Sequence, residues 1–315
     1  MTERKIITTV IIVTWNNEAV IRDCLTSVLK QNCANIEIIV VDNYSSDNTS
    51  ELIKKEFPQI TLIVNKENSG FAKASNQAIR KSQGCYILLL NPDTIMFGGS
   101  LEKMISFMHN HQDAGACGCK IIDEAGKLMW SCFHFPSLIT EICEITLLSR
   151  IFARDRFFGN YWMSYWDHST NSQVEWLTGA CLMVSREVVN KVGLLDEVFF
   201  MYTEDVDWCY RMKQQGYTVN YLANTQVVHK QGNSSNQAYS QMFAQRYRSR
   251  YLFFRKHYGL IRFVLLKIVV ILSFIIRVAC YLTGWIFIKD KVRAQKKISS
   301  YISVLRMSFT GLSKG

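Results

Sequence analysis

Apolar and polar positions alternate in blocks over the first hundred residues of the chain. Runs rich in Val, Ile and Leu, each the length of a strand buried on both faces of a parallel sheet, occupy 6–13, 36–41, 60–64 and 86–90. Between them, apolar residues recur at helical spacing over 18–31, 50–56 and 70–82. This order predicts an α/β fold with a doubly wound, mostly parallel central sheet and right-handed crossovers.

Polar residues directly follow three of the apolar runs. They are Thr14-Trp15-Asn16, Asp42-Asn43 and Asn91-Pro92-Asp93. In doubly wound sheets, ligands bind beyond the carboxyl ends of the strands. We therefore expect the carboxylates of Asp42 and Asp93 to lie along one ligand-binding rim of the sheet.

The C-terminal part carries a strongly apolar stretch at 261–288, interrupted by Lys267 and Arg277. A spanning helix needs about 20 mostly apolar residues, and a central cation is costly there. On a helix, these cations, Arg262 and Ser273 all lie on one face, within roughly 140°. An interfacial helix whose cations reach water is therefore favoured, and a spanning helix is disfavoured. A second amphipathic helix is expected at 292–307, and a soluble helical hairpin packed on the core is the alternative.

The domain organisation follows from these patterns. We expect a catalytic domain at 1–255 and a helical, membrane-associated appendage at 256–315. The segment 114–176 is less regular and rich in aromatic residues. Such a stretch is typical of core or of a lid packed on core, with an acceptor-binding surface as the alternative.

Charge and cysteine usage narrow the class of partner and compartment. The chain of 315 residues has a formal net charge of +10, and the excess is concentrated between Arg246 and Lys314, next to the apolar stretch. This placement favours a membrane surface over nucleic acid. The ten cysteines include no C-x-x-C pair, so we expect reduced, mostly buried thiols and no zinc site. The N-terminus lacks a secretory signal, which predicts a cytoplasmic catalytic part.

Sugar transfer from a nucleotide diphosphate would use the residue types at these strand ends. A divalent cation, Mg²⁺ or Mn²⁺, neutralises the leaving diphosphate, and a base deprotonates the acceptor hydroxyl. Asp93 is a candidate metal ligand, and Asp42 could accept from a nucleobase or a ribose hydroxyl. The segment 68–72 enters a helix, where free N–H groups suit a phosphate. His229 stands alone in this respect, and a lone histidine is more often structural than a ligand.

A group of acids lies further along the chain. Glu204, Asp205 and Asp207 crowd together, and such crowding raises at least one carboxyl pKa. This group is a candidate source of the base. The structural alternative for Asp205 is an acid that holds Arg211, one helical turn away.

The order and spacing of these segments resemble the family 2 glycosyltransferases, which share the GT-A fold. The resemblance covers roughly 5–255. Within the family, the chain is most similar to bacterial rhamnosyltransferases that build cell-surface polysaccharides such as O-antigen. The segments that carry it are VIIVTWNN at 10–17, IIVVDNYSSDNT at 38–49, NKENSGFAKASNQAI at 65–79, YILLLNPDT at 86–94, the stretch 176–217 with TEDVDWCYR, and VVHKQGNSS at 227–235.

The resemblance implies roles for individual residues. Asp93 would be the metal ligand, with Asn91 in place of the first acid of the family's D-x-D motif, and His229 would coordinate the metal or the diphosphate. Asp205 would be the catalytic base. The nucleotide would be bound by Thr14, Asn16, Asp42, Asn68, Gly70 and Asn91. The donor sugar and acceptor would be bordered by Trp176, Gly179, Ala180 and Glu204.

The function that the sequence predicts is therefore an inverting, metal-dependent glycosyltransferase. The expected donor is dTDP-rhamnose, with UDP-hexoses as the alternative, and the expected acceptor is a polyprenyl-diphosphate-linked saccharide. The expected location is the cytoplasmic face of the inner (plasma) membrane, as a peripheral or monotopic protein. Nucleotidyl transfer is disfavoured because no Gly-rich basic loop follows the first strand. A non-catalytic nucleotide-sugar-binding membrane scaffold is the alternative from another class.

Overall fold

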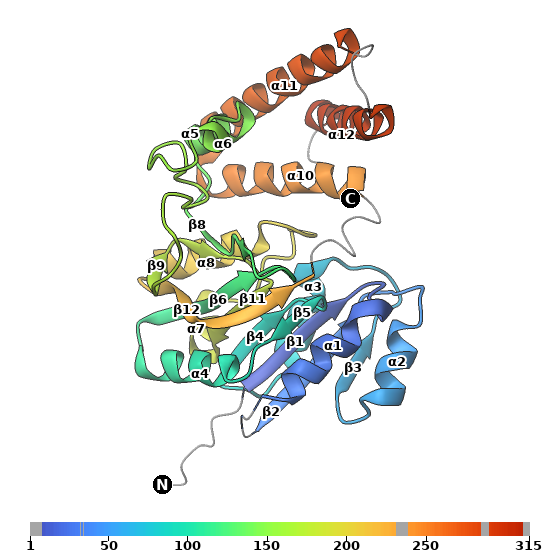
Figure 1. Ribbon diagram of the computed structural model, residues 1–315, viewed down its shortest axis with the longest axis vertical. Coiled ribbons are helices and arrows are strands. Elements are labelled where there is room, and N and C mark those ends of the chain that lie inside the picture. Colours follow the sequence, from blue (N-terminus) through green and yellow to red (C-terminus); the bar gives the residue numbers. More distant parts are fainter. Residues whose placement is uncertain (1–7, 32, 34, 231–238, 285–289, 311–315) are drawn as a thin grey trace. The chain divides into compact units, whose positions relative to one another are not determined.

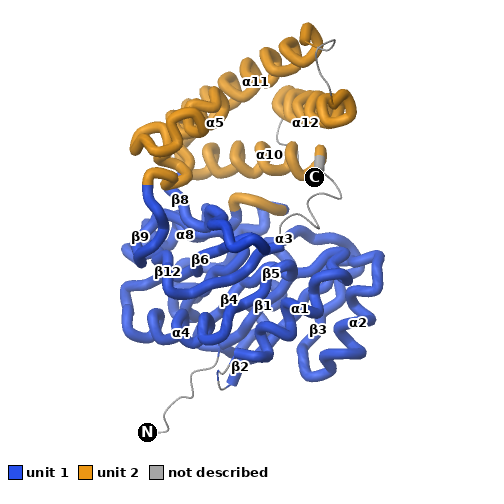
Figure 2. Tube along the Cα trace, in the orientation of Figure 1, with its two compact units in different colours: residues 1–135, 166–200, 204–234 blue, residues 136–165, 201–203, 235–315 orange. Residues whose placement is uncertain are grey.

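The computed structural model describes residues 8–31, 33, 35–230, 239–284 and 290–310. The chain forms two compact units (Figure 2). Unit 1 comprises residues 1–135, 166–200 and 204–234, and unit 2 comprises 136–165, 201–203 and 235–315. In unit 2, residues 136–165 and the helix that spans residue 255 pack with the C-terminal helices. The units therefore differ in their bounds from the division at 255/256 expected from the sequence.

Unit 1 begins with the alternation of strands and helices that the sequence predicts (Figure 1). The elements are β1 (Thr8–Thr14), α1 (Glu18–Leu29), β2 (Ile36–Asp42), α2 (Thr49–Glu56), β3 (Thr61–Val64), α3 (Phe71–Lys81), β4 (Tyr86–Leu90), β5 (Thr94–Met96) and α4 (Ser100–Asn110). The predicted start of the first strand, residues 6–7, lies outside the described residues. The other predicted ends agree within two residues.

The central sheet continues with strands from the second half of unit 1. These are β6 (Ala114–Ile122), β7 (Leu128–Met129), β9 (Ser172–Val174), β11 (Cys181–Ser185) and β12 (Thr218–His229). The strand order is β3-β2-β1-β4-β11-β6-β12-β5. The first four strands are parallel, β11 is antiparallel to both β4 and β6, and β6 and β12 are parallel. A two-stranded sheet pairs β8 (Cys132–Phe133) with β10 (Trp176–Leu177), and unit 1 also contains α7 (Arg186–Val192) and α8 (Glu204–Gln214).

The sheet is covered on both faces, which explains its continuous apolar strands. Val10 and Ile12 of β1 pack into the core with residues of α1, α2 and α4, whereas Ile11 between them is equally buried and points to the other face. The helix α3 packs against β1 and β2. The carboxyl ends of β1, β2 and β4 therefore share one edge, where Thr14, Asp42 and the Asn91 turn lie.

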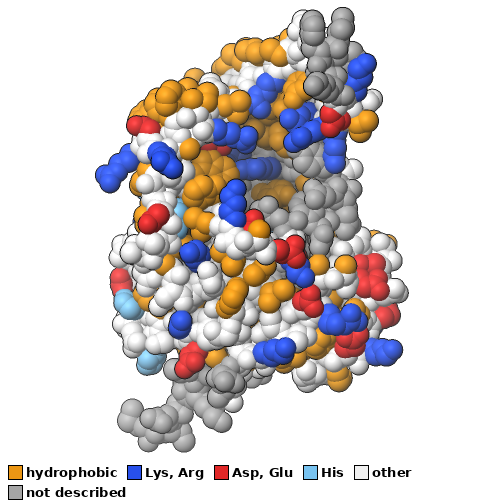
Figure 3. Space-filling view, in the orientation of Figure 1, with side chains coloured by type: hydrophobic (Ala, Val, Ile, Leu, Met, Phe, Trp, Pro, Cys, Tyr) orange, Lys and Arg blue, Asp and Glu red, His pale blue; other side chains and the backbone are white. Residues whose placement is uncertain are grey.

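Unit 2 is helical. It contains α5 (Leu138–Ile145), α6 (Leu148–Ile151), α10 (Tyr239–His257), α11 (Gly259–Thr283) and α12 (Lys291–Thr310). A capping box starts α5, in which the Ser137 hydroxyl accepts from the Thr140 N–H and the Thr140 hydroxyl accepts from the Ser137 N–H. The predicted apolar helix and the helix after it are thus confirmed as helices, although 285–288 lie outside the described residues. Figure 3 shows many Lys and Arg side chains over these helices.

Candidate functional site

Three polar side chains from separate parts of unit 1 meet beyond the end of β4. His229, the last residue of β12, is in register with Thr94 of β5, which places its ring beside the turn after β4. Its Nε2 lies 3.0 Å from Oδ1 of Asp93 and 3.5 Å from Nδ2 of Asn91. The side chains of His229 and Asp93 are 14% and 11% exposed, so a ligand can reach both. The structure therefore brings together Asn91, Asp93 and His229, although part of the last motif, 231–235, lies outside the described residues.

The Asp93–His229 pair fits a cation that arrives with a phosphate ligand. A carboxylate oxygen suits Mg²⁺, and carboxylate with imidazole nitrogen suits Mn²⁺. Within the part of the chain that the structure describes, no group of three or more His, Cys, Asp or Glu side chains could hold a metal ion. Mg²⁺ in phosphate-binding sites commonly takes one or two protein carboxylates and completes its shell with phosphate oxygens and water. Two protein ligands are therefore enough for a cation bound together with a diphosphate.

Asp205 is held in position by the backbone of the turn between β10 and β11 and by the backbone of its own helix. It lies in the first turn of α8, where an acidic side chain is stabilised by the helix dipole. Its Oδ2 accepts a hydrogen bond from the N–H of Gly179 (3.0 Å), and its Oδ1 accepts from the N–H of Val206 (2.8 Å). The carbonyl of the next residue, Ala180, accepts from the N–H of Asn91 (3.0 Å). One dipeptide thus connects the carboxylate of Asp205 to the turn after β4.

Arg211 has a different acidic partner from the one considered in the sequence. Its Nε donates to Oδ2 of Asp207 at 2.8 Å, and its two terminal nitrogens donate to the carbonyls of Val192 and Leu194, each at 2.7 Å. Asp207 is fully buried, so this pair is a structural ion pair. The alternative in which Asp205 serves to hold Arg211 is therefore wrong.

Glu204 is the buried member of the acidic group. Its side chain is 5% exposed, and its Oε2 has no hydrogen-bond partner among the described residues. Burial, reinforced by the charge of Asp205, raises the pKa of Glu204 well above its usual value. The predicted effect of crowding is thus confirmed for this residue, with burial as the larger cause.

Asp42 lies at the end of β2, in register with Thr14 of β1. Its Oδ2 accepts a hydrogen bond from the Ser50 hydroxyl (2.5 Å), and its Oδ1 accepts from the Ser45 hydroxyl. The residue is 1% exposed. In this structure Asp42 anchors the loop after β2, and a nucleoside would have to replace the bond from Ser45 to reach it.

Thr14 and Asn16 tie the loop after β1 to the loop after β2. The Thr14 hydroxyl is buried and donates to Oδ1 of Asn17 (3.1 Å). Asn16 has a left-handed backbone (φ 53°), donates its N–H to Ser45 Oγ (2.9 Å) and accepts from the N–H of Ser46 (2.7 Å). Non-glycine residues in this conformation cluster at ligand sites, since their strain is held by the surrounding structure.

Asn43 holds the loop that precedes α3, a role that the sequence interpretation missed. Its Oδ1 accepts from the N–H of Ser69 and from Nδ2 of Asn65, both at 3.0 Å. Its Nδ2 donates to Oδ1 of Asn68 (2.9 Å) and to the carbonyl of Gly70 (3.3 Å). The signal for it was its place directly after the strand-end carboxylate.

The start of α3 is closed by protein contacts. Gly70 has φ +82°, and a Cβ there would lie 2.3 Å from the carbonyl oxygen of Phe200. The N–H of Gly70 donates to Asn68 Oδ1 (3.1 Å), and the N–H of Phe71 donates to Phe200 O (2.7 Å). These two amides are therefore already bonded in this structure, and the phosphate role expected for the segment stays a prediction.

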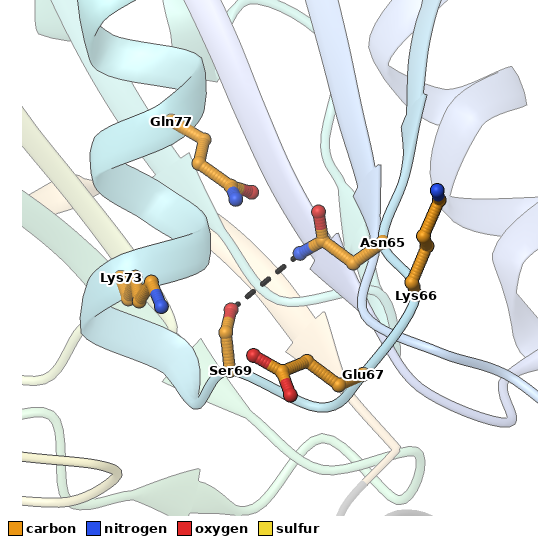
Figure 4. Close-up of a pocket in the computed structure, with 6 residues that line it drawn as sticks. All are labelled: Asn65, Lys66, Glu67, Ser69, Lys73 and Gln77. Atoms are coloured by element: carbon orange, nitrogen blue, oxygen red, sulfur yellow. Dashed lines mark hydrogen bonds between the residues drawn. The ribbon is translucent and has the colours of Figure 1, made fainter.

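A pocket of about 270 Å³ borders the same loop (Figure 4). Gln77 of α3 and Asn65 of the loop point toward one another across it, whereas Lys66 extends away. The residues that line it are Asn65, Lys66, Glu67, Ser69, Lys73 and Gln77. Of these, Ser69 belongs to the segment 68–72 that was predicted to bind a phosphate. The volume is below the range of about 300–1,000 Å³ for drug-sized ligands. The pocket by itself does not accommodate a nucleotide sugar.

Trp176 packs inside unit 1. Its ring stacks on Phe133 with 4.2 Å between centroids, and its Nε1 donates to the His134 carbonyl (2.9 Å). The residue is 7% exposed. It therefore supports the strand that leads to Gly179 and Ala180, and only a small part of its surface is open to a ligand.

Relatives of the chain are sugar transferases. Residues 9–193 match the model of the family described as glycosyl transferase family 2. An N-acetylglucosaminyl-diphospho-decaprenol L-rhamnosyltransferase of Mycobacterium tuberculosis is 27% identical over 229 residues, which are 69% of this chain and 74% of that protein. The dTDP-rhamnosyl transferase RfbF of Shigella flexneri is 28% identical over 233 residues, which are 71% of this chain and 69% of that protein.

Solved structures share the fold. A mannosyltransferase of Pyrobaculum calidifontis in complex with GDP-Man and Mn²⁺ has a TM-score of 0.59 at 16% identity, covering 96% of this chain and 86% of its own. GalNAc-T7 with UDP, GalNAc and Mn²⁺ has a TM-score of 0.56 at 15% identity, covering 78% of this chain and 48% of its own. The predicted GT-A-type fold is confirmed. Because the family match also covers more than half of the chain, the chain belongs to glycosyl transferase family 2.

Proposed function

We propose that this glycosyltransferase is metal-dependent and inverting, and that Asp205 is its catalytic base. The observation that carries the proposal is the connection made by Gly179 and Ala180. Through it, the carboxylate of Asp205 is bonded next to the turn that bears Asp93. A base and a phosphate-cation site that are held by one rigid dipeptide can act on the two ends of one displacement.

The mechanism follows from these positions. Oδ of Asp205 accepts the proton of an acceptor hydroxyl, and the oxygen attacks the anomeric carbon opposite the leaving nucleotide. Asp93 and His229 would hold Mg²⁺ or Mn²⁺, which supplies charge neutralisation for the departing diphosphate. A single displacement of this kind inverts the anomeric configuration. Burial of Glu204 raises its pKa and so disfavours a second negative charge beside the base.

For the donor we propose dTDP-rhamnose. The proposal is supported by similarity to the Mycobacterium and Shigella rhamnosyltransferases. The donor screen described below determines the sugar. A UDP-hexose is the competing donor. For the nucleotide site we propose the loops after β1, β2 and β3, because Asn16, Asp42 and Asn43 hold them together at the carboxyl edge of the sheet.

For the acceptor we propose a polyprenyl-diphosphate-linked saccharide at the cytoplasmic face of the inner membrane, with residues 256–315 in contact with that membrane. One relative is named for a decaprenol-linked acceptor, and α11 is long and apolar enough to cross a membrane by length and composition. A helix of this kind is weak support for a span, since a soluble core helix can pass the same test.

The experiment is a donor and transfer screen with the purified full chain. Thermal shift is measured with dTDP-rhamnose, UDP-glucose, UDP-N-acetylglucosamine and GDP-mannose, each with Mn²⁺ and with EDTA. The preferred donor is then incubated with a synthetic polyprenyl-diphosphate saccharide, and the new linkage is assigned by NMR. Metal-dependent transfer with inversion supports the proposal. Binding without transfer or hydrolysis indicates a scaffold, and a retained configuration contradicts the mechanism.

A further inference from the structure

The polarity of α11 is opposite to that of an ordinary surface helix. Its buried residues Leu266, Val270 and Phe274 recur every fourth position and define the side that packs in unit 2. Apart from Arg262 near the start of the helix, the exposed side is apolar. Its large exposed residues are Leu260, Ile261, Val264, Leu265, Ile268, Leu272, Ile275, Ile276 and Leu282. A surface helix in water normally turns its charged residues outward, so this face calls for an apolar partner.

The cations of α11 differ in their exposure. Arg262, near the start of the helix, is exposed, whereas Lys267 and Arg277 are half-buried, and the expectation that these two reach water stays a prediction. Arg277 donates to the Ile145 carbonyl and lies over the rings of Phe274 and Tyr301, at 5.8 and 5.9 Å. Its charge is thus bound on the protein side. The outward side of the helix is left without a charge between Phe263 and Thr283.

A second segment adds to the apolar surface. The helix α5 packs against α11, and a buried ion pair between Glu141 and Arg250 fixes it to α10. The exposed apolar side chains of this segment are Ile139, Ile142, Leu147, Ile151, Phe152 and Phe157. Arg150, Arg154 and Arg156 are exposed between them. In Figure 3, hydrophobic side chains gather over α11 and α5. We call these exposed apolar residues of α11 and of 139–157 the apolar face.

The charge of unit 2 decides what the apolar face binds. Eighteen of the 36 Lys and Arg residues belong to unit 2, but only four of the 26 Asp and Glu residues do. The net charge of +10 therefore arises entirely in unit 2, and unit 1 is slightly acidic. A second copy would bring the same positive charge toward the first, which is unfavourable. Anionic lipid headgroups match both the cations and the apolar side chains.

The helices next to α11 decide how deeply it enters. It packs against α10 and α12. The latter carries Lys291, Arg293, Lys296, Lys297 and Arg306. Carrying these cations into the hydrocarbon core would be strongly unfavourable. A helix packed along such neighbours can bury its outer face in a membrane but cannot be surrounded by lipid.

We propose that the apolar face is a composite membrane-binding surface, in which α11 and the 139–157 segment lie in the interfacial layer of an anionic bilayer and α11 does not cross it. This proposal extends the proposed contact with a membrane. It names the two segments of the protein that bind, the class of lipid that they bind and the depth to which α11 enters the bilayer. It is independent of sugar transfer, since it concerns binding without donor or acceptor.

The test is flotation of the purified full chain with vesicles. Vesicles of phosphatidylcholine alone are compared with vesicles containing about one third phosphatidylglycerol. Two double variants carry charge into each half of the apolar face: Leu272→Asp with Ile276→Asp, and Ile151→Asp with Phe152→Asp. The control is Leu29→Asp with Phe97→Asp, two residues of unit 1 with 42% and 44% exposure. All the substituted side chains are exposed, so circular dichroism and Tm should stay near wild type.

The expected result is flotation of the wild type and the control with anionic vesicles and weaker flotation with neutral ones. Each double variant should lower the partition coefficient at least about tenfold, because each removes two large side chains from lipid contact. An alkaline carbonate wash should release the protein. Wild-type flotation of the Ile151/Phe152 variant would remove that segment from the surface. Resistance to carbonate would show a spanning helix, and a dimer in light scattering without flotation would show a second copy as the partner. Each of these three outcomes overturns the proposal as stated.

Discussion

Nε2 of His229 lies 3.0 Å from Oδ1 of Asp93, although the two residues lie far apart in the sequence of unit 1. The pairing is a product of register. Val228 is opposite Ile95 and His229 is opposite Thr94, so the end of β12 arrives beside the turn after β4. The same strand pairing brings the Lys230 N–H to the Asp93 carbonyl at 2.8 Å.

Removing either partner should weaken cation use. We expect Asp93→Asn to lower kcat/KM about 100-fold or more, because the carboxylate is the hard ligand for the cation. We expect His229→Ala to lower it about 10–100-fold, with partial rescue at high Mn²⁺. The measurement is the transfer rate against Mn²⁺ concentration. The exposed His109→Ala variant is the control, and an unchanged Mn²⁺ dependence in both site variants would argue against this cation site.

Asp205→Asn should separate binding from turnover. The asparagine oxygen can still accept from the Gly179 N–H, so the fold and donor affinity should be retained, while kcat falls about 10²–10⁴-fold through loss of the base. Calorimetry measures donor binding and a product assay measures kcat. Asp207→Asn is the matched contrast, because it leaves the half-buried Arg211 without its acid and should lower stability by about 3 kcal/mol. Transfer at the wild-type rate by Asp205→Asn would disprove the assignment.

Gly70→Ala should destabilise the protein far more than a substitution of a glycine with a similar φ. Gly126 also has a positive φ, +78°, but a Cβ there meets nothing within 4 Å. We expect Gly126→Ala to lower the free energy of unfolding by about 1 kcal/mol, from backbone strain alone. Gly70→Ala should lower it by about 2–4 kcal/mol, because its Cβ collides with Phe200 O. Urea unfolding compares the two, and equal losses would contradict the close contact.

Glu204→Gln should change how stability depends on pH. The pKa of Glu204 is raised in the folded chain by burial, so its contribution to stability is full below the unfolded value of about 4.3 and is lost as pH rises through the folded pKa. Glutamine does not ionise, so the variant does not lose stability in this way as the pH rises. Its Tm relative to wild type should therefore increase from about pH 4 upward. A difference in Tm that is constant with pH would show that the carboxyl is not buried as described, and the exposed Glu187→Gln provides the control.

Several elements were predictable because their own side chains specify them. The strands β1, β2 and β4 are continuous β-branched or leucine runs, and α1 has helical apolar spacing. The strand β6 was not predicted. It contains Gly115 and Gly118, where a Cβ would meet Tyr217 at 2.8 Å and the Cys181 carbonyl at 2.9 Å. Close contacts with residues elsewhere in the chain therefore require glycine at these positions. Local periodicity in the sequence does not reveal such contacts.

The sequence by itself determined the α/β alternation, the family, and the polar residues at the ends of β1, β2 and β4, because burial on both faces of a strand leaves a mark in adjacent residues. Only the tertiary structure decided which polar residues meet. In the structure, β11 lies between β4 and β6, the Gly179 N–H donates a hydrogen bond to Asp205, and Arg211 forms an ion pair with Asp207. Arg277 of α11 is also bound to the Ile145 carbonyl. These outcomes depend on which distant segments share a core, and hydrophobic pattern specifies that a face is buried without specifying the partner that buries it.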